Sequence, residues 1–213
     1  MKKSVFTVGH STHTLERFVE LLITHSISAI ADVRSSPYSR VNPQFNRESL
    51  SQGLRQSDIA YVFLGKELGA RSDEPGCYRN GKVQYELLAE TEQFKKGVAR
   101  VIDGADKYRL ALMCAEKDPL DCHRAILVAK VLDEIGVSVN HILADRRIED
   151  HDQLVERMLQ KWKLSAGDMF SAREQFVAEA YRKQGQAIAY EDESLVGSVA
   201  NVGQHGKVGS AGQ

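Results

Sequence analysis

Three features are scarce or missing in this sequence of 213 residues: cysteine, an excess of charge of one sign, and long hydrophobic runs. No apolar stretch approaches the roughly 20 residues that a membrane helix needs, and the N-terminus leads into a strand-like stretch without the apolar core of a signal peptide. The 3 cysteines are an odd number and lack the spacing of a disulfide framework. We therefore expect a cytoplasmic protein in a reducing compartment, with no membrane as a partner.

The charges are balanced, with 28 basic and 29 acidic residues and a formal net charge of -1. A globally basic nucleic-acid-binding protein is therefore not indicated, although this balance still allows a local basic patch. Hydrophobic residues make up 42% and charged residues 27%, which is ordinary for a globular protein and argues against a fibrous or wholly disordered chain.

Several catalytic and cofactor motifs are also absent from the sequence. There is no G-x-G-x-x-G fingerprint, no G-x-S-x-G elbow and no C-x-x-C pair. The stretch from Gly76 to Lys82 approaches the phosphate-binding P-loop pattern, but Val83 stands where that motif requires Ser or Thr. The functional class must therefore be inferred from other groups of residues.

Strand-like and helix-like segments alternate along about the first 145 residues. Apolar runs predict strands at 4–8, 27–31, 60–64, 109–113 and 137–142. Helical periodicity predicts helices at 15–23, 48–56, 85–101 and 126–135, with irregular loops at 35–46 and 65–81. The alternation implies a three-layer α/β fold, with a parallel or mostly parallel sheet and helices on both faces.

After Asp145 the pattern becomes helical. One amphipathic helix spans 148–162, and a second begins at the capping-box sequence Ser171-Ala172-Arg173-Glu174. We therefore expect an α/β domain at 1–145, a helical extension at 146–190 and a glycine-rich, disordered tail at 191–213. The apolar faces of the extension are candidates for contacts in a homo-oligomer.

Polar side chains directly follow three of the predicted strands. The strand ends carry His10 and Ser11, then Asp32 and Arg34, then Cys114 and Glu116, with Cys122, His123 and Arg124 close behind. Ligands of parallel sheets bind beyond the carboxyl ends of the strands. We therefore expect these side chains to share one crevice.

Cys114 is the strongest single candidate for catalysis, because it follows an apolar strand at a point where the chain must turn. A thiolate there would be a nucleophile, with His10 or His123 as the base. Asp32 would orient a histidine or bind a ribose or water, and Glu116 would be a general acid if burial raises its pKa. The alternative is that this cysteine is simply a small buried hydrophobe.

The segment from Arg34 to Arg47 contains three arginines and no acidic residue, with Tyr38 and Phe45 between them. The arginine fork suits phosphate and carboxylate, and aromatic rings can stack on a base. The helix start after Cys122 also favours an anion. The predicted substrate-binding residues are Ser11, Arg34, Arg40, Cys122 and Arg124. The alternative is a solvated loop whose aromatic residues pack on the core.

A metal site is a second alternative for the cysteines. Its ligands would be Cys114, Cys122 and His123, with His10 as a fourth. Structural zinc sites normally use cysteine pairs two to four residues apart, whereas these two are eight apart in the sequence. The sequence identifies no cofactor.

The blocks VGHSTHTLERF, ADVRSSPYSRVNPQFN, the Leu68-Gly69-Ala70-Arg71 turn and CAEKDPLDCHR, followed by a helix and VNHILAD, carry a family resemblance. Over residues 3 to 145 the chain resembles the bacterial and archaeal proteins catalogued as domain of unknown function 488. In that family the turn is usually Leu-Gly-Gly-Arg. The resemblance implies a compact α/β domain and no settled reaction, substrate or cofactor. The matching motif residues are His10, Ser11, Asp32, Arg34, Pro37, Cys114, Glu116, Cys122, His123 and Arg124.

Three functional hypotheses follow. The first is an enzyme acting on a phosphorylated small molecule, a nucleotide or a nucleic-acid end. The second is a binding module that recognises a nucleotide or nucleic acid without turnover. The third is a metal-binding protein that uses the Cys/His group.

Overall fold

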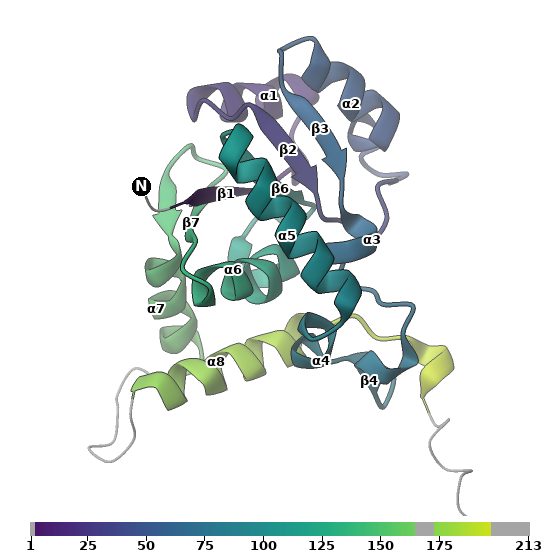
Figure 1. Ribbon diagram of the computed structural model, residues 1–213, viewed down its shortest axis with the longest axis vertical. Coiled ribbons are helices and arrows are strands. Elements are labelled where there is room, and N and C mark those ends of the chain that lie inside the picture. Colours follow the sequence, from purple (N-terminus) through teal and green to yellow (C-terminus); the bar gives the residue numbers. More distant parts are fainter. Residues whose placement is uncertain (1–2, 165–172, 197–213) are drawn as a thin grey trace, which may run out of the picture.

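The computed structural model describes residues 3–164 and 173–196. A six-stranded sheet with the order β3-β2-β6-β1-β7-β8 forms its centre (Figure 1). The strands are β1 (Ser4–Gly9), β2 (Ala29–Asp32), β3 (Ala60–Phe63), β6 (Leu110–Cys114), β7 (Ser138–Ile142) and β8 (Ile148–Asp150). Every pairing is parallel except that of β8 with β7. The predicted mostly parallel α/β sheet is therefore confirmed.

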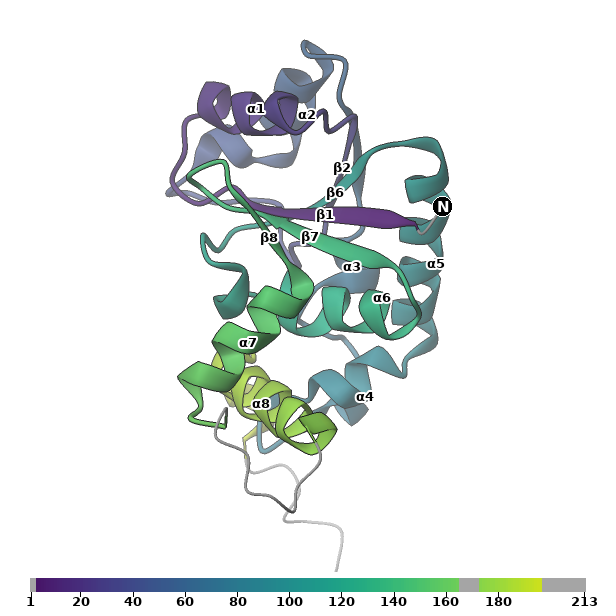
Figure 2. The same ribbon diagram turned by 90° about the vertical axis from the view of Figure 1, so that its left-hand side faces the viewer.

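Helices cover both faces of the sheet (Figure 2). They are α1 (Leu15–Thr24) and α2 (Arg47–Arg55) on one face, and α5 (Glu92–Lys107), α6 (Lys130–Glu134) and α7 (His151–Lys161) on the other. Neighbouring strand residues alternate between the two layers: Phe6 packs with Phe18 of α1, whereas Val5 belongs to the core that includes Phe94 of α5. The central strands are buried on both faces, which explains why they read as continuous apolar runs.

Residues 65–81 contain more regular structure than the sequence predicted. Helix α3 (Gly65–Leu68) opens this stretch, and the 3-10 helix η2 (Pro75–Cys77) leads to a hairpin of β4 (Tyr78–Arg79) and β5 (Lys82–Val83). Asn80 and Gly81 form its two-residue turn, with φ of 50° and 76°. An Asn-Gly pair with two positive φ values is the usual sequence of such a turn, so this prediction of an irregular loop was wrong.

The C-terminal extension begins with a strand rather than a helix. Ile148 was expected to start a helix but belongs to β8, and α7 follows with a capping box between Asp150 and Gln153. Helix α8 (Arg173–Ile188) packs beside α7 and, with α4 (Tyr85–Ala89), lies at the same end of the molecule (Figure 1). The predicted cap at Ser171 and the part of the predicted tail from residue 197 onward lie outside the described residues.

Buried hydrogen bonds tie this extension to the sheet. Thr7 Oγ1 lies 2.8 Å from His141 Nδ1, and His141 Nε2 lies 3.0 Å from His151 Nδ1. The hydroxyl of Tyr181 on α8 completes the chain at 2.8 Å from His151 Nε2. All four side chains are buried, so β1, β7, α7 and α8 are joined by one polar path through the core.

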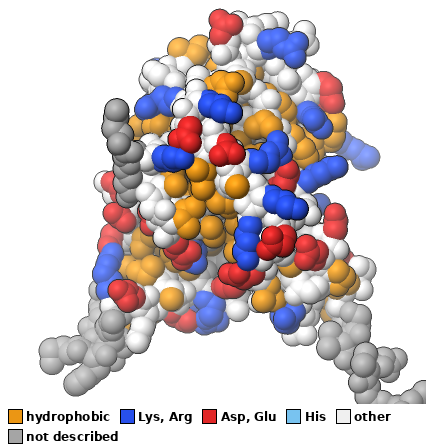
Figure 3. Space-filling view, viewed as in Figure 1, with side chains coloured by type: hydrophobic (Ala, Val, Ile, Leu, Met, Phe, Trp, Pro, Cys, Tyr) orange, Lys and Arg blue, Asp and Glu red, His pale blue; other side chains and the backbone are white. Residues whose placement is uncertain are grey.

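The surface carries both signs of charge. Acidic and basic side chains are interspersed over the face seen in Figure 3, and hydrophobic side chains gather near its middle. In the described part of the chain, no helix combines the length and the apolar character needed to cross a membrane.

Candidate active site

The strand order brings three strand ends to one place. Strand β6 lies between β2 and β1, and its last residue, Cys114, pairs with Gly9. Beyond the strands, the His10 N–H donates to the Cys114 carbonyl at 2.9 Å, and the Val33 N–H donates to the Met113 carbonyl at 3.0 Å. The carboxyl ends of β1, β2 and β6 are therefore locked side by side.

Gly9 allows this close approach. A Cβ atom at Gly9 would lie 1.9 Å from the backbone oxygen of Glu116 and 3.2 Å from Arg124 Nη2. Only a residue without a side chain lets the loop after β6 pass directly over the end of β1.

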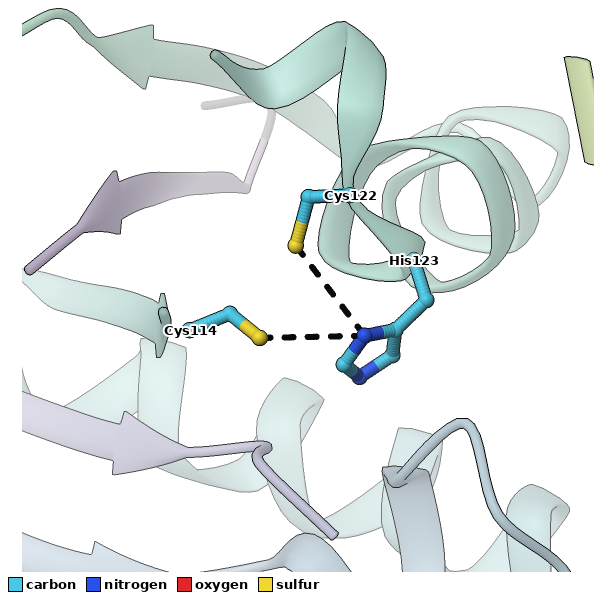
Figure 4. A group of neighbouring side chains, drawn as sticks. All are labelled: Cys114, Cys122 and His123. Carbon is cyan, nitrogen blue, oxygen red and sulfur yellow. Dashed lines mark hydrogen bonds between the residues drawn. The ribbon is translucent and has the colours of Figure 1, made fainter. Parts of the chain in front are cut away.

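Two sulfur atoms and one imidazole nitrogen meet above β6 (Figure 4). Cys114 Sγ lies 3.7 Å and Cys122 Sγ 4.0 Å from the same atom, His123 Nδ1. The three donor atoms all lie within 4.8 Å of one another. The side chains belong to β6 and to the turn between the 3-10 helix η3 (Pro119–Asp121) and the π-helix η4 (Arg124–Ala129). We call Cys114, Cys122 and His123 the Cys/His cluster.

The opposite side of the His123 ring is held by the backbone. Its Nε2 lies 3.0 Å from the carbonyl oxygen of Val33, so Nε2 carries a proton and donates. In the neutral ring, Nδ1 is then an unprotonated lone pair that faces both sulfur atoms.

The pKa values of the two thiols and of nearby Glu116 depend on one another. The hydrogen bond with Cys122 and the burial of the thiol raise the pKa of Cys114. Burial opposes ionisation of Cys122, but the hydrogen bond from Cys114 and the charge of Arg124 lower its pKa. Burial also raises the pKa of Glu116, whose Oε2 lies 2.8 Å from Cys122 Sγ. A proton must lie between these two atoms, because two anions at this distance would repel each other.

Arg124 is fully buried and holds the loop around the Cys/His cluster. Its Nη1 donates to the Glu116 carbonyl at 2.7 Å and its Nη2 to the Lys117 carbonyl at 3.3 Å, while its backbone N–H approaches Cys122 Sγ at 3.5 Å. These contacts position the loop. They leave the predicted role of Arg124 in substrate binding untested.

A buried ion pair follows β2. Arg34 Nε and Nη2 donate to the two carboxylate oxygens of Asp32 at 2.9 and 2.6 Å, and the Tyr61 hydroxyl adds a third donor to Asp32 at 2.8 Å. Arg34 Nη1 lies 3.3 Å from His10 Nε2. This pair joins the ends of β1 and β2.

His10 is held as a neutral ring. Its Nδ1 donates to the Ser11 carbonyl at 2.8 Å, and the ring stacks on Phe45 with 4.3 Å between centroids. Burial is the main reason that its pKa falls to about 4. Its remaining lone pair on Nε2 accepts from Arg34.

A cavity of about 430 Å³ opens above these groups. Of the predicted site residues it is lined by His10, Arg34, Cys114, Glu116 and His123. Asp32, Cys122 and Arg124 are buried beside it, whereas Ser11 and the exposed Arg40 are outside the lining.

Some of the lining was not anticipated. Arg71, Tyr85 and Tyr190 border the cavity, and the Arg71 guanidinium lies over the Tyr190 ring at 4.4 Å from its centroid. Arg71 belongs to the Leu68–Arg71 turn, one of the motifs that carry the family resemblance, so that motif could have identified Arg71 as a candidate site residue. Tyr190 is brought in from the end of α8 by the bond from the Val83 N–H to the Tyr190 carbonyl at 3.0 Å.

A sequence profile described as "Domain of unknown function DUF488" matches residues 14–131, more than half of the chain. The chain belongs to the DUF488 family. The matched stretch of this DUF488 protein contains Asp32, Arg34 and the whole Cys/His cluster, while His10 precedes it and Tyr190 follows it. A second profile, described as "Nuclear speckle splicing regulatory protein 1, N-terminal", matches residues 141–195, which include β8, α7 and α8. No curated protein and no solved structure matches the chain.

Proposed function

We propose that this DUF488 protein is an enzyme that holds an anionic, phosphate-bearing substrate in the 430 Å³ cavity and acts on it at the Cys/His cluster. One observation carries the proposal. The cavity lies at the carboxyl ends of β1, β2 and β6, and it is lined both by Cys114 and His123 and by guanidinium and hydroxyl groups.

Arg71 is the main candidate for binding the anion. Within the described residues its side chain is exposed and has no carboxylate partner among the ion pairs, in contrast to Arg34, which is neutralised by Asp32. Ser35, Ser36 and Ser39 line the same cavity and add hydroxyl donors. Guanidinium and hydroxyl groups together match the acceptor-rich surface of a phosphate.

The reactive centre in this proposal is Cys114 with His123, because both line the cavity and their Sγ and Nδ1 atoms are 3.7 Å apart. Cys114 is only 3% exposed, so a substrate must reach it from within the cavity. Its replacement by Ser or Ala should abolish turnover of a phosphorylated substrate while preserving the fold. Full activity in both variants would remove Cys114 from the mechanism.

Anion binding can be measured before any reaction is known. Isothermal titration with pyrophosphate should show one site, and Arg71→Gln should weaken it about tenfold or more, a loss of about 1.4 kcal/mol. Arg55→Gln is the matched control, because Arg55 lies exposed on α2 and outside the cavity lining. If wild-type protein binds neither pyrophosphate, phosphate nor adenosine monophosphate at millimolar concentration, the proposal is wrong.

A further inference from the structure

The Cys/His cluster brings three side-chain atoms that can bind a metal within 4.8 Å of one another. Cys114, Cys122 and His123 are 3%, 1% and 7% exposed, so all three side chains are more than nine-tenths buried. They come from two segments separated by a seven-residue loop that Arg124 holds in place. A cysteine that only fills space in the core would not need a second thiol and an imidazole nitrogen beside its sulfur.

We propose that Cys114 Sγ, Cys122 Sγ and His123 Nδ1 bind one zinc ion, and that the fourth coordination position faces the substrate cavity. Zinc binds thiolate sulfur at about 2.3 Å and imidazole nitrogen at about 2.0–2.1 Å in tetrahedral geometry. At a tetrahedral angle, a sulfur and a nitrogen ligand are then about 3.6 Å apart. The two sulfur-to-nitrogen separations in the structure are 3.7 and 4.0 Å, close to this value before any ion is placed.

The contacts of His123 Nδ1 within the cluster are long for hydrogen bonds, because the two sulfur atoms lie 3.7 and 4.0 Å from it. With its Nε2–H donating to the Val33 carbonyl, the neutral His123 ring offers a single lone pair at Nδ1. Only one thiol can donate to that lone pair in good geometry, and the Cys122 thiol is placed to donate to Glu116 Oε2 at 2.8 Å instead. One cation between the three atoms would use the lone pair and both sulfur atoms at once.

The surroundings match those of a metal ligand set. A ligating histidine usually donates its other ring N–H to a carboxylate or backbone carbonyl, which fixes the tautomer and orients the ring. His123 does this through Val33. The Arg124 N–H, 3.5 Å from Cys122 Sγ, is placed to support a ligating thiolate. Binding displaces the thiol protons of Cys114 and Cys122, which pass to the solvent as the zinc–sulfur bonds form.

The open position follows from which ligands reach the cavity. Cys114 and His123 line the cavity, whereas Cys122 lies behind them. Three protein ligands with a free fourth position are typical of catalytic zinc, which polarises a bound oxygen as a Lewis acid. Metal binding itself is independent of the proposed function. The catalytic role of the ion rests on that proposal, and zinc would then act where the phosphate-bearing group is held.

Elemental analysis of the full chain, purified without a tag and dialysed after zinc loading, tests the site. We expect one zinc ion per chain, and loss of that zinc in Cys114→Ser, Cys122→Ser and His123→Ala. Cys77→Ser is the matched control and should keep its zinc, because Cys77 is also 3% exposed but lies outside the cluster. Wild-type protein without zinc would overturn the proposal, and iron or copper in its place would overturn the assignment of the ion.

Cobalt substitution of the wild-type protein keeps the test valid if a variant fails to fold. Cobalt held by two thiolates and an imidazole should give thiolate-to-cobalt charge-transfer absorption and the strong visible bands of tetrahedral coordination. Weak octahedral bands without charge transfer would overturn the site.

Pyrophosphate titration of the same preparation separates the two proposals. Stoichiometric zinc without anion binding refutes the proposed function and leaves the metal site standing. Anion binding without zinc refutes the metal site alone. The open fourth position predicts that Glu116→Gln retains its zinc, and loss of zinc in this variant would show that the position is filled by Glu116.

Discussion

His123 Nε2 donates to the carbonyl oxygen of Val33 across 3.0 Å, and this bond connects the loop after β6 to the end of β2. Because it fixes the ring from behind, the Nδ1 atom is aimed at Cys114 and Cys122 without help from any ligand. The chemistry proposed for this protein depends on that fixed orientation, and the residues that support it can be tested one at a time.

Gly9→Ala should disrupt the loop that carries the Cys/His cluster. The new Cβ would overlap the Glu116 carbonyl oxygen at 1.9 Å, so the loop must move, at a cost of about 1–3 kcal/mol in the free energy of unfolding. Urea denaturation measures the loss. Gly76→Ala is the control, since a Cβ there would have no atom within 4 Å, and equal stability of the two variants would contradict the argument.

Asp32→Asn should be strongly destabilising. Arg34 is 5% exposed, and without the carboxylate its guanidinium would be a buried charge without a counterion, which costs about 3–5 kcal/mol. Chemical denaturation of wild type and variant gives the difference. The exposed pair of Asp145 and Arg147 provides the comparison, because Asp145→Asn should leave stability nearly unchanged. A similar loss of stability in both variants would show that the buried pair contributes no more to stability than the exposed pair.

Tyr181→Phe should loosen the attachment of α8. The substitution removes the hydroxyl 2.8 Å from His151 Nε2 and leaves that buried nitrogen without its partner, a loss of about 1–3 kcal/mol. Hydrogen exchange should accelerate in α8 more than in the central strands. Tyr108→Phe serves as the control on a residue that is 46% exposed; if it loosens α8 equally, the hydroxyl of Tyr181 has no particular role.

The buried histidines should make the protein less stable in acid. Burial lowers the pKa values of His141 and His151, reinforced at His141 by His151 and Arg124 and opposed at His151 by carboxylates such as Asp133. Both rings take up protons more readily in the unfolded chain, where the pKa is about 6.5. Their contribution to stability is therefore complete above about pH 7 and declines as the pH falls below about 6.5.

Urea denaturation from pH 8 to pH 5 measures this decline. Other acidic groups also titrate in this range, so the informative quantity is the difference between wild type and His151→Gln. Glutamine cannot be protonated, and the variant should lose stability less steeply between pH 6.5 and 5, by up to about 1.4 kcal/mol per pH unit. Parallel curves would show that His151 takes up its proton equally in the folded and unfolded states, so that folding does not lower its pKa.

The five parallel strands and the shared rim could be predicted from the sequence, because strands buried on both faces are continuous apolar runs. Their polar ends then meet at one edge whatever the strand order. The prediction that Cys114, His10 and Arg34 line one crevice needed only this geometry, and the structure brings them together.

Other features depend on contacts that no local pattern encodes. Strand β8 is three residues long and is fixed by pairing with β7, so Ile148 was assigned to the adjoining helix. Tyr190 reaches the cavity through β5, more than 100 residues away in the chain. The role of Arg124 in holding the loop could not be predicted either, because it depends on which carbonyl groups lie near its guanidinium group. By contrast, the turn at Asn80 and Gly81 could have been predicted, because an Asn-Gly pair is typical of a two-residue hairpin turn.

The position of β7 has a practical consequence for producing the protein. The stretch matched by the family profile, residues 14–131, contains neither β1 nor β7, so on its own it would leave β6 with an open edge and would lack the core residues Leu154 and Met158. Unpaired edges next to bare apolar surface lead to intermolecular association. The recognisable family stretch is therefore shorter than the smallest piece able to fold, and expression of that stretch alone should yield aggregates.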